Sequence, residues 1–124
     1  MDNLNIQQTE NSLAVSFNAT SGVMRVEGVS YPEDPMVFFV SLKTWLRDYM
    51  AKIRGPLTLD LKLDYLNSSS TKCLLDFIET LEDYHNNGAD VKINWYYDED
   101  DDNIEEMGED LAEDLSVPFN LIVC

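Results

Sequence analysis

A stretch of strict alternation between two stretches of helical spacing constrains the fold of this chain more than any other feature. Leucine stands at every second position from Leu57 to Leu63, with Thr58, Asp60 and Lys62 between. This period of two is typical of a β-strand that buries one face. Apolar residues on either side recur at three- and four-residue spacing, which is typical of helices that bury one side. A strand between two helices predicts crossover connections and a largely parallel sheet.

The same two periods describe the rest of the chain. Two alternating segments flank a turn-like stretch and predict an N-terminal hairpin. Asp34 and Pro35 suit the cap and first position of a long helix, which Gly55 and Pro56 end. The sequence predicts, in order, strands Leu13–Phe17 and Val23–Glu27, a helix from Pro35, the strand Leu57–Leu63, a helix with the apolar stripe Cys73–Tyr84, the strand Val91–Trp95, a helix Ile104–Leu115 and the strand Phe119–Val123, with an optional short strand near Leu4–Ile6.

This order, β-β-α-β-α-β-α-β, predicts one α/β domain spanning residues 1–124. We expect a mixed, mostly parallel sheet with an N-terminal hairpin and about three helices packed on it. The 124 residues are enough to bury a core, and an apolar fraction of 44% argues against disorder.

Acidic residues outnumber basic ones by 24 to 8, which gives a formal net charge of -16. Such a surface repels nucleic acid and anionic membranes, because no basic patch offsets the charge. Free nucleotides and phosphorylated metabolites are poor ligands for the same reason, and no cofactor is predicted. Two interpretations remain, a basic protein partner and a purely solubilising charge.

Three features of the sequence indicate a reduced, cytoplasmic location. No apolar run approaches the roughly 20 residues that a membrane span needs. The opening residues, MDNLNIQQTEN, carry neither a basic segment nor an apolar signal region. Cys73 and Cys124 have no metal-ligand spacing and are too few for a disulfide framework. We expect Cys73 to be buried and inert on the apolar side of its helix.

Four consecutive hydroxyl residues, Ser68 to Thr71, separate the leucine-rich strand from the helix after it. Ser68, Ser69 or Ser70 can serve as the helix N-cap, a role typically worth about 1 kcal/mol. A cap needs only one such residue. The turn also suits a phosphate, because a helix N-terminus favours an anion and Lys72 lies in the first turn. On the residues alone both roles stay open, and the cap is the simpler one.

An acidic run, Tyr97 to Asn103, has a spacing close to that of a calcium loop. Its candidate ligands are Asp98, Asp100, Asp102 and Glu109. Asn103 stands where the sharp turn of such a loop needs glycine, and a strand precedes the run. A divalent-cation-binding module is therefore an alternative function, and a solvated acidic loop before a helix is the simpler interpretation.

Residues for catalysis are few, so we expect a protein that is not an enzyme. His85 is the one histidine and stands at the end of a predicted helix, without a partnered base or nucleophile motif. A small hydrolase centred on His85 is the weakest alternative. In the aromatic run that follows, Trp95 and Tyr97 share a strand face with Ile93 and at least one should be core, whereas Tyr96 faces the other way.

Three stretches together resemble one family and occur in its order. They are SYPEDP at 30–35, LDYLNSSSTK at 63–72 and NWYYDEDDDNIEEMGED at 94–110. The family is that of the SiaC-like regulatory phosphoproteins, small bacterial domains that resemble STAS-type anti-sigma-factor antagonists. The resemblance spans nearly the whole chain and implies a STAS-like fold.

The resemblance also implies a function. Members of this family are phosphorylated by a dedicated serine/threonine kinase on a hydroxyl directly after the Asn of a strand-to-helix motif, and a PP2C-like phosphatase removes the phosphate. The unmodified form binds and activates a diguanylate cyclase, which links it to cyclic di-GMP and biofilm formation. Related partner switches control sigma factors instead, and that remains an alternative.

By position, the resemblance implies that Ser68, directly after Asn67, is the phosphoacceptor; the family often has Thr there. Ser69, Ser70 and Thr71 are the alternatives. We expect the partner-binding residues to include Asn67, Ser68, Ser69 and Lys72, together with Tyr31 in the loop Tyr31–Asp34, where an exposed Tyr-Pro stands beside acids.

Overall fold

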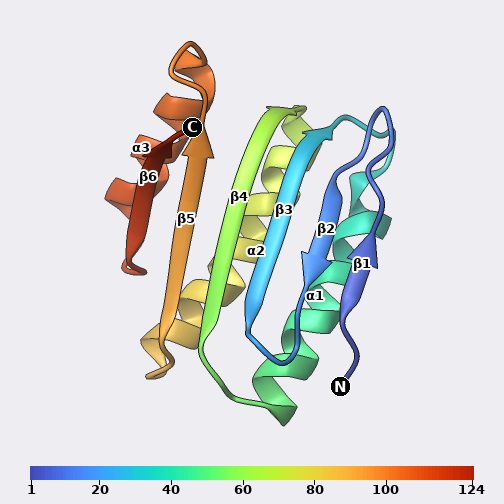
Figure 1. Ribbon diagram of the computed structural model, residues 1–124, viewed down its shortest axis with the longest axis vertical. Coiled ribbons are helices and arrows are strands. Elements are labelled where there is room, and N and C mark those ends of the chain that lie inside the picture. The colour runs from blue at the N-terminus through green and yellow to red at the C-terminus, as the bar shows by residue number, and fades with distance from the viewer.

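The computed structural model describes all 124 residues and contains six strands and three helices (Figure 1). The elements are β1 (Leu4–Ile6), β2 (Ala14–Phe17), β3 (Val23–Ser30), α1 (Pro35–Lys52), β4 (Leu57–Leu66), α2 (Ser68–Asn86), β5 (Val91–Tyr97), α3 (Asp102–Asp114) and β6 (Phe119–Val123). The α/β fold and the order of elements predicted from the sequence are confirmed, and the optional first strand is present. No helix combines the length and apolar character that a membrane span requires.

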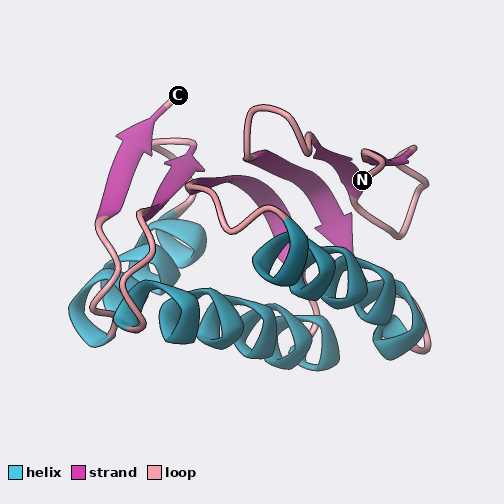
Figure 2. Cartoon of the chain, turned by 90° about the horizontal axis from the view of Figure 1, so that it is seen from below, coloured by secondary structure: helices cyan, strands magenta, loops and turns pink.

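The six strands form one sheet in sequence order, β1-β2-β3-β4-β5-β6. The β1–β2 and β2–β3 pairs are antiparallel, and the three pairs from β3 to β6 are parallel. Because every crossover advances the chain by one strand in the same direction and hand, all three helices lie on one face (Figure 2). The protein therefore has two layers, and the other face of the sheet has no helix over it.

The core lies between the sheet and the helices. The alternating leucines of β4, Leu57 to Leu63, are all buried there, as their period of two predicted. Each helix contributes the stripe expected from its spacing: Phe39, Leu42, Trp45, Leu46 and Tyr49 from α1, Leu74, Phe77, Ile78 and Leu81 from α2, and Ile104 and Leu111 from α3.

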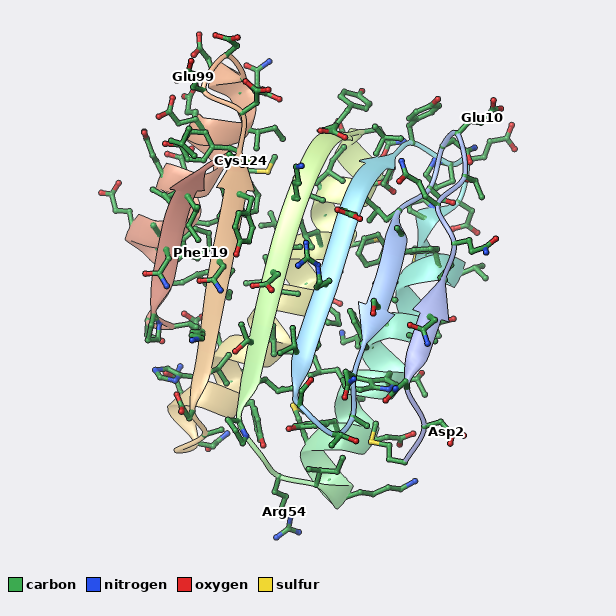
Figure 3. The ribbon with its side chains drawn as sticks, in the orientation of Figure 1. Asp2, Glu10, Arg54, Glu99, Phe119 and Cys124 are labelled. Carbon is green, nitrogen blue, oxygen red and sulfur yellow. The ribbon has the colours of Figure 1, made fainter.

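Polar residues cover the open face of the sheet, which faces the viewer in Figure 3. One register row crosses all six strands and consists of Asn5, Ser16, Arg25, Asp60, Asn94 and Asn120. Within it, Asn120 Nδ2 donates to Asn94 Oδ1 at 3.0 Å, and Asn94 Nδ2 donates to Asp60 Oδ1 at 2.8 Å. This ladder satisfies polar groups on a face that no helix covers.

The one irregularity of the sheet lies just before the hydroxyl run. The β3–β4 register pairs Gly28 with Leu63 but Val29 with Tyr65, so Asp64 is an extra residue in β4. This β-bulge leaves Asp64 and Tyr65 both exposed and turns Leu66 inward. Bulges of this kind re-aim a side chain at the end of a strand. Here the side chain is that of Tyr65.

Candidate functional site

The strand β4 ends at Leu66, and α2 begins two residues later at Ser68, which makes Asn67 the N-cap. The Asn67 Oδ1 atom accepts a hydrogen bond from Ser70 N at 2.8 Å. The expectation that Ser68, Ser69 or Ser70 would cap the helix is therefore wrong. Asn caps a helix as well as Ser does. Because β4 ends at Leu66, Asn67 is the first residue available to cap α2. None of the four hydroxyl residues is therefore needed as the cap.

The four hydroxyl side chains point in different directions, because successive residues of a helix are turned by about 100°. Ser68 and Ser69 are exposed, Ser70 is fully buried and Thr71 is half-buried. Thr71 Oγ1 donates to the Asn67 carbonyl oxygen at 3.0 Å. Only Ser68 and Ser69 thus present a free, accessible hydroxyl to a modifying enzyme.

The buried member of the run joins two of the three motifs that resemble the SiaC family. Ser70 Oγ lies 2.7 Å from Ser30 Oγ, and both side chains are buried. Beside them, Asn67 N donates to the Ser30 carbonyl oxygen at 2.9 Å. The ends of β3 and β4 are therefore fastened together beneath the exposed serines.

Two exposed tyrosines lie at the same end of the sheet. The rings of Tyr31 and Tyr65 have centroids 6.2 Å apart, and their side chains are 47% and 54% exposed. Tyr31 is exposed, as expected for the loop Tyr31–Asp34, and its role in partner binding stays a prediction. Tyr65 was not predicted, although one signal was present: the inward leucines Leu63 and Leu66 are three residues apart instead of two.

Exposed apolar side chains on the first turns of α1 extend this surface. Met36, Val37 and Val40 are all more than half exposed. Met36 and Ser69 line the same hollow, of about 460 Å³, between the N-termini of α1 and α2. We call Tyr31, Met36, Tyr65, Ser68 and Ser69 the switch face.

Lys72 and Cys73 also line this hollow, and the Lys72 side chain is exposed. Cys73 is half-buried at its wall, so the expectation of a fully buried core cysteine is wrong, because its position on α2 points toward α1 and not toward the sheet. Burial raises the pKa of the Cys73 thiol, and the carboxylates of Asp76 and Asp34 raise it further. The thiol is therefore neutral at pH 7 and a poor nucleophile, as expected from the sequence.

The acidic loop does not assemble the candidate calcium site. Asp98 Oδ1 accepts from the backbone N–H of Asp100 at 3.0 Å, whereas Asp102 and Glu109 belong to α3. No group of three or more acidic, histidine or cysteine side chains in the chain is placed to hold a metal ion. The loop projects beyond the end of β5, where Glu99 marks its tip in Figure 3.

The remaining candidate residues have structural partners. His85 Nδ1 lies 3.1 Å from the carbonyl oxygen of Ala89, in the turn that closes α2. Trp95 is fully buried, and its Nε1 donates to the Ile104 carbonyl oxygen at 3.0 Å. Tyr96 and Tyr97 are half-buried on opposite faces of β5. The alternation predicted for the aromatic run is confirmed.

Residues 6–124 match the model of the family described as SiaC family regulatory phosphoprotein. The chain belongs to this family. An uncharacterised protein of Pseudomonas aeruginosa strain UCBPP-PA14 is 35% identical over 119 residues, which cover 96% of this chain and 94% of that protein.

Solved structures of SiaC family members have the same fold. The crystal structure of apo-SiaC from P. aeruginosa superposes with a TM-score of 0.93 at 35% identity, covering 98% of this chain and 99% of that one. A second structure is of the diguanylate cyclase SiaD in complex with its activator SiaC, also from P. aeruginosa. Its SiaC chain has a TM-score of 0.93 at 34% identity, with 98% of this chain and 99% of that chain covered. The family predicted from the three motifs is thus confirmed.

Proposed function

We propose that this protein is a cytoplasmic, non-enzymatic phospho-switch whose unmodified form binds and activates a diguanylate cyclase. Ser68 is the phosphoacceptor, a dedicated kinase adds the phosphate, and a PP2C-like phosphatase removes it. The observation that carries the proposal is the exposed Ser68 hydroxyl at the first position of α2, within the switch face and next to the hydrogen bonds that join Ser30 to Asn67 and Ser70.

The positions of the four hydroxyls support Ser68 as the acceptor. Ser70 is occupied by its bond to Ser30 in the core, and Thr71 donates to the Asn67 carbonyl. Ser69 is the remaining alternative, since it is also exposed. Ser68 directly follows the capping Asn67, which is the position that the family resemblance assigns to the acceptor.

Electrostatics supply the switching mechanism. Phosphorylation would add about -1.5 to -2 charges to a protein whose net charge is already -16. The amides of Ser68 and Ser69 have no acceptor within the helix, and Lys72 is one turn further along, so the fold can accommodate the phosphate. A partner seated on the apolar and aromatic switch face would have to bury that dianion, which costs several kcal/mol without a pairing cation. A loss of about 5.5 kcal/mol changes a binding equilibrium from 99:1 to 1:99, and each ~1.4 kcal/mol weakens binding tenfold.

A diguanylate cyclase as the partner is supported by the comparison with SiaC, whose structure is known in complex with SiaD, the cyclase of which it is the activator. A relative that acts as the activator of a separate cyclase favours a regulatory role for this chain over a catalytic one. Exposed apolar side chains beside Ser68 suit a protein partner more than a small ligand.

The first test is to locate the phosphate. Trypsin releases residues 63–72, LDYLNSSSTK, as one peptide that contains all four hydroxyls. Fragmentation mass spectrometry of protein purified from its native host should place a phosphate on Ser68. A phosphate on Ser69 would move the switch by one residue, and a peptide that stays unmodified under every growth condition would contradict the proposal.

The second test measures binding and cyclase activation with the host's SiaD-like diguanylate cyclase. Ser68→Ala should bind like the unmodified protein, and Ser68→Asp should bind at least tenfold more weakly with unchanged circular dichroism. Thr44→Asp is the matched control, because it adds the same charge at an exposed position of α1 outside the switch face, and it should bind like the unmodified protein. Equal binding by Ser68→Ala and Ser68→Asp would overturn the mechanism, and binding to an anti-sigma factor in place of the cyclase would overturn the partner.

A further inference from the structure

A second groove, separate from the hollow at the switch face, lies between α2 and α3. It has a volume of about 420 Å³ and is lined by Thr71, Leu75, Asn103, Glu106, Met107, Asp110, Leu111 and Asp114. The proposed switch does not use it, because the switch face lies toward α1 whereas this groove lies on the other side of α2.

The floor of the groove is apolar. Leu75 on α2 is 40% exposed although it projects from the middle of a packed helix. Met107 on the facing side of α3 is half-buried, and Leu111 reaches the core below it. Covering the exposed Leu75 side chain with an apolar side chain of a partner removes apolar surface from water, which favours binding.

The wall that α3 contributes is a row of carboxylates. Glu106, Asp110 and Asp114 follow one another at intervals of four residues, so they lie about 6 Å apart along one side of the helix. All three are exposed, and none makes a salt bridge or a side-chain hydrogen bond within the chain. The whole of α3 carries seven carboxylates and no basic residue.

We propose that this groove binds a basic amphipathic helix of a partner protein. Leucine-like side chains at intervals of three and four residues would cover Leu75 and Met107. Lysine or arginine at intervals of four would meet Glu106, Asp110 and Asp114 in register, since the two helices share the same rise per residue. The row of unpaired carboxylates steers a basic segment toward the groove and disfavours acidic ones.

A second copy of this chain is a poor occupant. The side of α1 next to α2 carries Met36, Val40, Lys43 and Arg47 at helical spacing, but Lys43 is already paired with Asp76 of α2. Two copies would also bring together net charges of -16 each. If α1 of one copy bound in the groove of another, the contact would be head-to-tail. Each end of such an assembly would still have a free groove or a free α1, so the assembly would not close as a symmetric dimer does.

The test uses a synthetic helical peptide of about 15 residues, with leucines along one side and lysines on both flanks, at 150 mM salt. The groove variant Glu106→Gln/Asp110→Asn/Asp114→Asn should weaken its binding about tenfold. The matched variant Asp48→Asn/Asp90→Asn/Glu99→Gln removes the same three charges from exposed sites elsewhere and should weaken it twofold or less. Equal losses would mean that the peptide senses only the net charge, and would overturn the proposal.

The apolar floor is tested separately. Leu75→Ala should weaken peptide binding about fivefold, whereas Val37→Ala, on α1, should leave it unchanged. Amide chemical-shift changes should centre on Thr71, Leu75 and Met107; changes centred on α1 would overturn the assignment. A dimer in light scattering that the groove variant abolishes would assign the groove to a second copy instead. Because the variants leave Ser68 intact, failure here is separable from failure of the phospho-switch.

Discussion

The hydroxyl oxygens of Ser30 and Ser70 lie 2.7 Å apart inside the core and join the end of β3 to the first turn of α2. They are the two polar residues among the buried side chains of the chain. A buried hydroxyl costs little when it is bonded and roughly 1–3 kcal/mol when its partner is removed. The pair therefore fixes where the exposed Ser68 and Ser69 stand.

Removal of both members of this pair should cost less than the sum of removing each one alone. Ser70→Ala leaves the Ser30 hydroxyl buried without a partner and should lower the free energy of unfolding by about 1–3 kcal/mol. The double variant Ser30→Ala/Ser70→Ala should lose less than the sum of the two single changes. Urea denaturation of the four proteins completes the cycle, with exposed Ser69→Ala as a control expected within about 0.5 kcal/mol of the parent. Strict additivity would show that the two hydroxyls are not coupled.

The N-cap of α2 should tolerate only a residue whose side chain can accept the hydrogen bond from the Ser70 amide. Asn67→Ala removes the acceptor of the Ser70 amide proton and should cost about 1 kcal/mol. Asn67→Asp keeps an acceptor and adds a negative charge at the helix N-terminus, so it should be neutral or slightly stabilising. Thermal unfolding of both variants at pH 7 provides the comparison, and equal losses would assign another role to Asn67.

Gly108 should resist a change that helix propensity favours. Alanine in place of glycine inside a helix gains about 1 kcal/mol. A β-carbon at Gly108 would lie 2.5 Å from Trp95 Cδ1 and 2.7 Å from Leu121 Cδ2, so α3 would have to move off the sheet. We expect Gly108→Ala to be net destabilising by about 1–3 kcal/mol and to shift the fluorescence of Trp95. Gly88→Ala is not a matched control because of its positive φ; Ala112→Gly, expected to cost about 1 kcal/mol by propensity alone, calibrates the helix.

Two tyrosines should make the fold sensitive to alkali. Tyr49 Oη donates to the Pro56 carbonyl and Tyr84 Oη to the Gly55 carbonyl, both at 2.7 Å, and they brace a turn in which Arg54 has a φ of 57°. Burial raises the pKa of both phenols; for Tyr49 the neighbouring Tyr84 raises it further.

Because the folded-state pKa values are above the unfolded value of about 10, the contribution of these phenols is complete below pH 10. It is lost as the pH rises from there through the folded-state values. Tyr49→Phe and Tyr84→Phe should each cost about 1 kcal/mol at pH 7 and should flatten the fall in stability above pH 10. Chemical denaturation between pH 7 and 11 measures both effects, and an unchanged alkaline slope in both variants would contradict this assignment.

The hydrophobic spacing in the sequence was sufficient to predict the order of strands and helices, because each element buries only one of its faces. The leucines of β4 and the stripe of α2 each have a period that fits a single type of element, and short connections leave sequential strand order as the simplest arrangement. The bulge at Asp64 was not predicted, since the alternation simply stops there and a strand end gives the same pattern. Its effect, the exposure of Tyr65, was missed for the same reason.

The sequence predicted that the strand-to-helix turn lies at residues 67–71. It did not predict which of these residues caps the helix, which is buried and which are exposed. A run of four hydroxyls does not reveal which of them is buried, because this depends on where the helix begins. Once Asn67 is the cap, the 100° turn per residue puts Ser70 inward and Ser68 outward. The groove between α2 and α3 could not be predicted from the sequence either, because it depends on how these two separate helices pack next to each other.

The sequential order of the strands has a consequence for where the protein frays. Strands β1 and β6 stand at the two edges and carry the two chain termini, whereas β4 lies between β3 and β5 (Figure 1). Amide protons at edges and termini exchange with solvent through small local openings, and those of central strands exchange only when most of the structure opens. Residues 67–71 directly follow β4, so their position should be kept when an edge strand opens locally. A tag or fusion at either end of the chain should therefore leave the position of Ser68 undisturbed.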